Sequence, residues 1–390
     1  MSSSGLWMRM TGLAAAGATL LAVISGATGF EHRLLAALAL PPLVALVLAG
    51  RLARPRLFVP SFVALMLFGA AALVPGEPLH AALAALAFAA TLVAAAQTFR
   101  GAHVAPGAWR DYVTLTKPRI MTLLLLTGAC GMIVGAQGWP STSLFVATMA
   151  GLALACGGAS ALNHVLDADI DRLMGKRTQA RPVAAGRIEP GRALEFGLAL
   201  SAFSFVLLGS TVNVLTAALA LAGNVFYVVV YTRWLKRSTP QNIVIGGAAG
   251  AVPPLVGWAA ATGNLTVPAL FLFLIVFFWT PPHFWALALL IRDNYAAARV
   301  PMLPVVRGER ETLRQIVAYA LVLIAVTLLP FAWGTFGTGY AVAALALGGT
   351  FLALTLRLRR APSRPRASLL FHYSLLYLAL LFVAMAVDVL

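Results

Sequence analysis

The stretch NHVLDADIDR, residues 163–172, ends a long apolar run and leads into a loop rich in Arg and Lys. Asn163, Asp167 and Asp171 are spaced four residues apart, so on a helix they fall on one face, about one turn apart. Ionisable side chains at membrane depth are expensive to bury, and they therefore mark candidate functional sites. The stretch predicts a membrane-spanning helix that presents oxygen ligands at one end.

Two carboxylates and an amide that point in one direction suit Mg²⁺, which prefers oxygen ligands and usually shares them with substrate phosphates. Asp169 falls on the other side of the helix, and we expect it to be an ordinary solvated acid. Three basic residues follow closely, Lys176, Arg177 and Arg181. They fit two roles equally well, as the cations that neutralise a diphosphate and as simple topology signals.

The composition of the chain excludes a soluble domain. Of its 390 residues, 61% are hydrophobic and 10% are charged, whereas soluble domains carry about 25% charged residues. A bilayer-spanning helix needs roughly 20 apolar residues. We therefore predict an all-α polytopic membrane protein with thirteen spans, near residues 11–30, 34–50, 57–74, 79–99, 121–139, 143–166, 192–211, 213–231, 243–261, 268–291, 315–334, 339–356 and 369–388.

The net charge of +16 does not indicate a nucleic-acid partner, because the basic residues lie in short clusters between the apolar runs. If the N-terminus is cytoplasmic and the spans alternate, 27 of the 28 Lys and Arg residues fall on the cytoplasmic side. Only Arg33 falls outside, and cytoplasmic loops carry such an excess. We therefore expect a cell-membrane protein with its N-terminus and polar loops in the cytoplasm and its C-terminus outside.

Two further polar loops, 227–242 and 279–310, lie on the same predicted side. In the first, Lys236 and two neighbouring arginines fit topology signals as well as they fit contacts to an anion. Tyr231 fits an interfacial aromatic as well as a site residue. We keep Tyr231 and Lys236 as candidate diphosphate contacts.

The second of these loops begins with two prolines, Pro281 and Pro282, inside an apolar run, which predicts a broken helix beside a cavity. His283 stands next to them, and a histidine with its hydrogen bonds satisfied inside the bundle is the alternative to a ligand. Asp293 and Asn294 follow at the end of the span and form a second set of oxygen ligands. Two such clusters flanked by cations predict a prenyl diphosphate site, with the apolar tail inside the bundle.

Residues 110–335 closely resemble the protohaem IX farnesyltransferases, or haem O synthases, of the UbiA prenyltransferase superfamily. The Asn/Asp stretch is typical only of the superfamily. Two other stretches, PQNIVIGG at 240–247 and WTPPHFWALAL at 279–289, are specific to the haem branch. Residues 336–390 fit the last spans of the family, and residues 1–105 lie outside the resemblance. The matching stretches are LTKPRI at 115–120, NHVLDADID at 163–171, RTQARP at 177–182, YTRWLKRSTPQNIVIGGAAGAVPPLVGW at 231–258, WTPPHFWALAL at 279–289 and VPMLPVV at 300–306.

The resemblance implies a nine-helix bundle around a central cavity over residues 106–390, preceded by a four-span extension of unknown role over residues 1–105. It implies that Asn163, Asp167 and Asp171 are the first Mg²⁺–diphosphate motif. Lys176, Arg177 and Arg181 match its diphosphate-binding basic residues. Lys117 and Arg119 match its KPR entry motif and are further candidate diphosphate contacts.

The second motif departs from the family. Members have Asp directly before its Tyr, where this chain has Asn294, with Asp293 one residue earlier. Arg299 also stands where Gly is usual. The second half of the metal site, Asp293 with Asn294, is therefore open. His283 lies in the haem-branch motif, which implies a contact with the porphyrin.

The implied reaction transfers the farnesyl group of farnesyl diphosphate to a vinyl group of haem B, with addition of water, to give haem O and diphosphate. Mg²⁺ is the implied cofactor, and a haem A synthase or terminal oxidase assembly is the implied partner. One alternative is a UbiA-type enzyme that prenylates an aromatic quinone precursor, and the haem-branch stretches argue against it. A transporter is the alternative from another class, since broken helices and intramembrane acids occur there too. The gathering of polar residues on one face argues against transport.

Overall fold

The computed structural model describes residues 3–25, 30–52, 55–73, 79–97 and 108–390. These residues form helices and contain no β-strand, which confirms the predicted all-α fold class. Nine helices within the described residues are long and apolar enough to cross a membrane. They are α6 (Pro118–Ala136), α7 (Thr142–Leu166), α10 (Pro190–Thr211), the continuous span Val214–Ser238, α13 (Asn242–Thr262), α14 (Val267–Leu290), α17 (Gly308–Ala332), α18 (Thr338–Arg360) and α19 (Arg364–Asp388).

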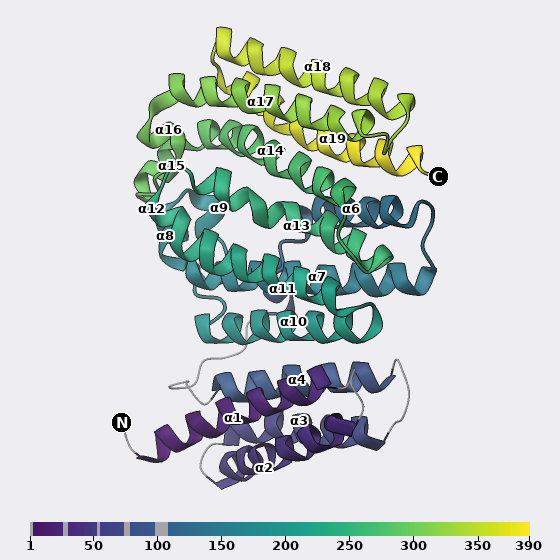
Figure 1. Ribbon diagram of the computed structural model, residues 1–390. Helices are drawn as coiled ribbons and strands as arrows, with labels where there is room; N and C mark the ends of the chain where they lie inside the picture. The colour runs from purple at the N-terminus through teal and green to yellow at the C-terminus, as the bar shows by residue number, and fades with distance from the viewer. Residues whose placement is uncertain (1–2, 26–29, 53–54, 74–78, 98–107) are drawn as a thin grey trace.

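Four more helices precede this bundle, and Figure 1 shows them as a separate layer beneath it. The last of them packs on α10, where Phe88 and Leu92 contact Ala202 and Val206. The predicted boundary at residue 105 lies outside the described residues. The prediction that these four helices each span the membrane stays a prediction. Their bounds are α1 (Ser3–Ser25), α2 (Phe30–Leu52), α3 (Pro55–Leu73) and α4 (Leu79–Gln97).

Two helices of the bundle, α6 and α13, pack backbone against backbone. A Cβ atom at Gly257 would collide with the carbonyl oxygen of Gly128 on α6. Glycine permits this close approach because it has no side chain. In lipid the hydrophobic effect does not drive helices together, so their association depends on such van der Waals packing. The contact fixes the middle of α6 against α13.

The predicted break at Pro281 and Pro282 is wrong. The helix α14 continues from Val267 to Leu290 with both prolines inside it and buried. The proline ring favours a helical φ and removes only one N–H donor per residue. Neighbouring helices can satisfy the freed carbonyl groups in a membrane bundle, so the helix continues past both prolines.

The fourth span of the bundle is longer than predicted. The prediction placed its end at residue 231, but α11 (Val214–Val225) continues through a π-helix, η1 (Phe226–Leu235), into α12 (Lys236–Ser238). The prediction was wrong because an apolar run indicates only the part of a helix that lies in the hydrocarbon core of the membrane. Charged residues extend the helix beyond that run, and the site uses this extension.

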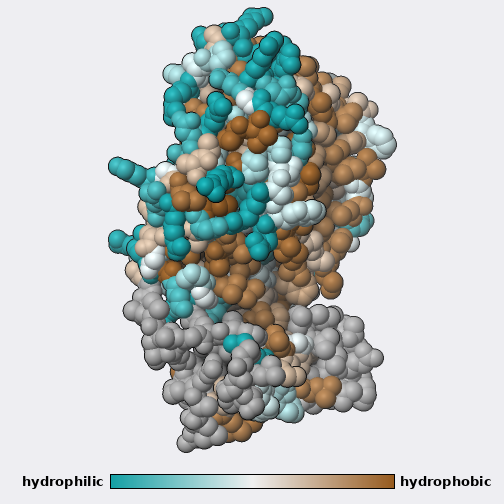
Figure 2. All heavy atoms as spheres, turned by 90° about the vertical axis from the view of Figure 1, so that its left-hand side faces the viewer, coloured by the Kyte–Doolittle hydropathy of each residue, from teal (hydrophilic) through white to brown (hydrophobic). Residues whose placement is uncertain are grey.

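The polar connections gather at one end of the bundle, on the left of Figure 1, and α19 ends at the opposite end. Figure 2 looks onto this polar end, where hydrophilic side chains gather beside an apolar flank. The short helices of the connections are α5 (Trp109–Leu115), α8 (Ala168–Leu173), α9 (Lys176–Gln179), α15 (Arg292–Ala297) and α16 (Leu303–Val306). The protein is a multi-pass membrane protein whose polar groups concentrate at one end.

Candidate functional site

The candidate site begins where α7 passes into α8. The amide of Asp167 donates to the carbonyl oxygen of Asn163 at 2.9 Å, and that of Asp171 donates to the carbonyl of Asp167 at 2.8 Å. Helical hydrogen bonding therefore continues across the junction, and the three side chains share one face as the spacing predicted. Asn163, Asp167 and Asp171 are each no more than 2% exposed. Two carboxyl groups this deeply buried require compensation from cations or hydrogen bonds.

Three cations supply that compensation, and each contacts a different member of the motif. Lys117 Nζ donates to Asn163 Oδ1 at 2.7 Å. Lys236 Nζ lies 2.6 Å from Asp167 Oδ2. Arg181 Nη1 contacts both oxygens of Asp171, at 2.7 and 2.9 Å. The three basic residues come from segments far apart in sequence, and when all three are protonated they exceed the two carboxylates by one positive charge.

Lys117 is held in a strained backbone conformation. Its φ of 50° lies in the left-handed region, which is uncommon for a residue with a side chain. The residue forms the N-cap of α6, directly before Pro118. Burial, with a smaller contribution from Arg181, lowers the pKa of Lys117 to about 7. An anion beside Nζ would offset both the burial and the repulsion from Arg181, as expected for a group that binds diphosphate.

The π-helix η1 places two residues of the span against the motif. Thr232 is fully buried, and its hydroxyl donates to the carbonyl of Tyr227, five residues earlier, at 2.9 Å. Its oxygen also accepts from Asn163 Nδ2 at 3.1 Å. One turn later, Lys236 reaches Asp167. Single π turns recur at functional sites because they redirect side chains from the regular α-helical face. The sequence prediction missed Thr232, since it placed the end of the span at residue 231 and a single threonine at that edge gives no signal.

Lys236 makes an ion pair with the motif, whereas Tyr231 makes aromatic and packing contacts. Its ring stacks on Tyr227, with centroids 5.5 Å apart, and packs over Gly246 of α13. A side chain at Gly246 would collide with this ring. Tyr231 therefore lines the wall beside the motif, and its contacts join η1 to α13.

Three of the predicted basic residues are not part of this buried cluster. Arg119, Lys176 and Arg177 are exposed. Among the described residues, none of the three makes an ion pair with the motif. They lie exposed at the polar end of the bundle.

The two residues of the second predicted cluster, Asp293 and Asn294, differ in their burial. Asp293 is exposed on α15. Asn294 is half-buried and faces the connection between α8 and α9, where its amide lies so close to Gly175 that a Cβ atom there would be 2.8 Å away. Asn294 is therefore the member of the pair that packs against the polar connection after α8.

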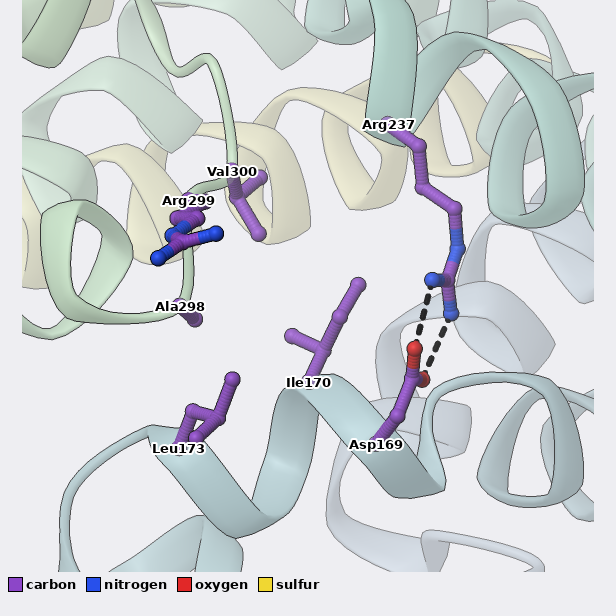
Figure 3. A pocket seen from close by; sticks show the side chains of 7 residues that line it. All are labelled: Asp169, Ile170, Leu173, Arg237, Ala298, Arg299 and Val300. Atoms are coloured by element: carbon purple, nitrogen blue, oxygen red, sulfur yellow. Dashed lines mark hydrogen bonds and ion pairs between the residues drawn. The ribbon is translucent and has the colours of Figure 1, made fainter.

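A pocket of about 250 Å³ opens on the other face of α8, next to Asp169 and Arg237 (Figure 3). Arg237 binds both oxygens of Asp169 at 2.7 Å, and this pair lowers the pKa of Asp169 to about 2. Asp169 is exposed, as predicted, but it is an ion-paired acid. Arg299 lies across the pocket with a φ of 53°, in the left-handed region that favours glycine.

His283 lies on α14, away from the acidic motif, and faces α19. Its ring is stacked between Trp279, at 4.3 Å between centroids, and Phe371, at 4.8 Å. Its Nδ1 lies 2.6 Å from the hydroxyl oxygen of Ser374. The predicted histidine is thus held rigidly by three neighbours.

The sequence profile of the UbiA prenyltransferase family matches residues 124–381. The chain belongs to the UbiA prenyltransferase family. It is 55% identical to a protohaem IX farnesyltransferase of Symbiobacterium thermophilum over 282 residues, which cover 72% of this chain and 94% of that one. A protohaem IX farnesyltransferase of a Roseiflexus species is 53% identical over 283 residues, 73% of this chain. The match spans about half, 53%, of that longer relative.

A UbiA homolog from Archaeoglobus fulgidus, solved with DMAPP and Mg²⁺ bound, has the same fold. It superimposes with a TM-score of 0.55 at 18% identity, over 71% of this chain and 99% of that chain. The matches to the Symbiobacterium relative and to this solved structure cover 72% and 71% of the chain, so more than a quarter of this UbiA prenyltransferase lies outside them.

The motif of this UbiA prenyltransferase fits a Mg²⁺ ion. Asp167 Oδ1 is buried and makes no hydrogen bond to any described residue, which leaves one carboxylate oxygen free to coordinate. No group of three or more His, Cys, Asp or Glu side chains that could hold a metal occurs within the described ranges. Mg²⁺ does not need one, since it usually binds one or two carboxylates, waters and substrate phosphates. Asp167 and Asp171, with Asn163 beside them, supply such a set.

Proposed function

We propose that the chain transfers the farnesyl group of farnesyl diphosphate to a vinyl carbon of haem B, and that water adds to the product to give haem O. Relatives at 53–55% identity that carry the name protohaem IX farnesyltransferase support this proposal. The observation that carries it is the pairing of Lys117, Lys236 and Arg181 with the three motif residues. A diphosphate needs this combination of cations beside oxygen ligands for a metal.

Lys117, Arg181 and Lys236 hold the diphosphate at the polar end of the bundle. Their charges stabilise the negative charge that develops on the leaving diphosphate as the bond from C1 to oxygen breaks. A Mg²⁺ ion held by Asp167 and Asp171 would supply additional charge stabilisation for the same leaving group. Asn163 orients this arrangement, since its amide bridges Lys117, Asp167 and Thr232.

The bundle interior provides for the rest of the substrate. The farnesyl chain is apolar, and the interior beyond the motif is lined by apolar helices. The electron pair of a haem vinyl group attacks C1 of the allylic cation. Water then adds to the resulting cation beside the porphyrin ring and releases a proton to solvent, which leaves the hydroxyl group. Burial of the motif keeps bulk water from the first cation, which would otherwise give farnesol. His283 is the residue that we assign to the porphyrin.

Mass analysis of the products separates this proposal from its nearest rival. Purified protein receives Mg²⁺ and farnesyl diphosphate with either haem B or a hydroxybenzoate. We expect a farnesylated, hydrated haem in the first reaction and no prenylated product in the second. A prenylated hydroxybenzoate without haem O would replace the proposal with that of a quinone-precursor enzyme.

We also propose that the polar end faces the cytoplasm, because positive charge concentrates there. Lys176 is exposed at this end and suits a cysteine probe. In Lys176→Cys, we expect a membrane-impermeant maleimide to label inverted vesicles and to leave right-side-out vesicles unlabelled. Labelling from both sides would favour a transporter with alternating access.

The role of residues 1–105 and the handover of the product are separate proposals. We propose that the helices α1–α4, which reach the bundle through α4 and α10, form an appended membrane layer.

Haem O is consumed by haem A synthase chemistry, so a haem A synthase or a terminal oxidase assembly is the proposed partner. Co-purification of such a protein from membranes, and its loss when residues 1–100 are deleted, would support a docking role for this layer.

A further inference from the structure

We infer that His283 ligates the iron of the haem acceptor through its Nε2 atom. The inference rests on the proposed function, since it takes haem to be the acceptor. It adds an atom-level contact that fixes where the porphyrin lies relative to α14 and α19.

The hydrogen bonds around Ser374 determine which nitrogen of His283 carries the proton. The hydroxyl oxygen of Ser374 lies 2.6 Å from the carbonyl oxygen of Phe371. Two oxygens this close share a proton, and only the hydroxyl has one to donate. The same hydroxyl oxygen lies 2.6 Å from His283 Nδ1 and must accept there. Nδ1 therefore carries the proton, and Nε2 keeps its lone pair.

That lone pair has no partner within the protein. Nε2 makes no hydrogen bond to any residue in the described part of the chain. His283 is half-buried, and Nε2 is not among the buried nitrogen atoms that lack a partner in the described residues, so this unpaired atom is accessible. A neutral imidazole with an accessible Nε2 is the form of histidine that binds iron in haem proteins.

The neighbours of His283 are those that a metal-binding histidine needs. Histidine ligands almost always donate their second N–H to an acceptor, which fixes the ring and raises its basicity. Ser374 is that acceptor here, and its backbone carbonyl also accepts from Trp279 Nε1 at 2.7 Å. The stacked rings of Trp279 and Phe371 hold the imidazole plane from both sides. The ring is therefore fixed before any ligand arrives.

Two packing contacts connect this histidine to the diphosphate side of the bundle. Tyr231 packs over Gly246, and Thr280 packs against the next residue, Gly247. Thr280 precedes His283 by one helical turn on α14. Helix α13 therefore contacts both α14, which carries His283, and η1, which carries Tyr231. A porphyrin bound at His283 is anchored on α14. Iron ligation there would hold the macrocycle while a vinyl group at its edge reaches the farnesyl chain.

The test is optical and electron paramagnetic resonance spectroscopy of the full-length protein titrated with ferric haem B, without farnesyl diphosphate. We expect wild-type protein to give a histidine-ligated spectrum. His283→Phe keeps an aromatic ring in the stack and removes the nitrogen, so it should lose that spectrum. External imidazole should restore the spectrum in His283→Ala. Ser374→Ala should weaken haem binding by about 10-fold, the usual effect of losing the partner of a ligand.

His372 provides a matched control. It is exposed on α19, and its Nδ1 contacts its own helix at the carbonyl of Ser368. His372→Ala should leave the spectrum unchanged. An unchanged spectrum in His283→Phe, or no histidine signature in wild type, would overturn the inference even if haem O is still made. A His283-dependent spectrum without haem O production would instead overturn the proposed function and leave the ligation intact.

Discussion

The ion pair between Asp167 and Lys236 separates the contribution of the motif to stability from its contribution to chemistry. The two charged groups lie 2.6 Å apart, with side-chain exposures of 1% and 10%. Asp167→Asn keeps the shape of the side chain, removes its charge and leaves Lys236 buried without a counter-ion. Breaking a buried pair in this way costs about 3–5 kcal/mol. We therefore expect Asp167→Asn to melt well below the wild type in detergent.

The double variant Asp167→Asn with Lys236→Met removes both charges. A buried ion pair replaced by groups of similar volume is often neutral for stability, so the double variant should recover most of the loss. Turnover should behave differently, because the proposed metal ligand is still missing. Removing one electrostatic group from an active site costs about 10²- to 10³-fold in rate. We expect both variants to lose at least that much haem O formation.

The assay combines thermal unfolding with mass analysis of haem O formed from farnesyl diphosphate and haem B. Asp169→Asn is the matched control, since Asp169 lies two residues away with 63% of its side chain exposed. Its pair with Arg237 is worth about 1 kcal/mol or less, and its loss should change turnover little. Wild-type turnover in the stable double variant would refute the assignment of Asp167 to the diphosphate site.

Other measurements test the packing, the metal and the π-helix. Gly257→Ala drives a methyl group into the carbonyl of Gly128 and should destabilise the protein by about 1–3 kcal/mol, whereas Gly250→Ala, with open space around it, should stabilise it by about 0.5–1 kcal/mol; melting temperatures compare the two. Excess chelator should abolish haem O formation and added Mg²⁺ should restore it, so full turnover in chelator would contradict a metal role. Thr232→Val removes the hydroxyl that accepts from Asn163 and should lower turnover about 10-fold, while Thr232→Ser should restore it; equal rates in both variants would contradict a positioning role.

Much of the fold could be predicted because lipid imposes a simple rule on sequence. Each span must be long and apolar, and the nine spans after residue 110 were found near their true positions. The errors came where this rule does not apply. The helix through Lys236 continues past its apolar run, and the prolines of α14 do not end it. Hydropathy does not report either feature.

The candidate site was predictable where its residues follow one helix, as Asn163, Asp167 and Asp171 do. The choice among the basic residues was not. Every Lys or Arg near the polar end of the bundle reads equally well as a topology signal, so Lys176 and Arg181 looked alike in the sequence. Packing distinguishes them, since Arg181 contacts Asp171 and Lys176 is exposed.

The sequence by itself determined the membrane class of this protein, the face that carries its acidic motif and its membership of a prenyltransferase family. Those properties depend on composition and on spacings within single helices. The tertiary structure decided which cations meet the motif, how the π-helix turns Thr232 and Lys236 toward it, and which nitrogen of His283 is free. These depend on distances between segments far apart in the chain, which periodicity along one helix does not encode.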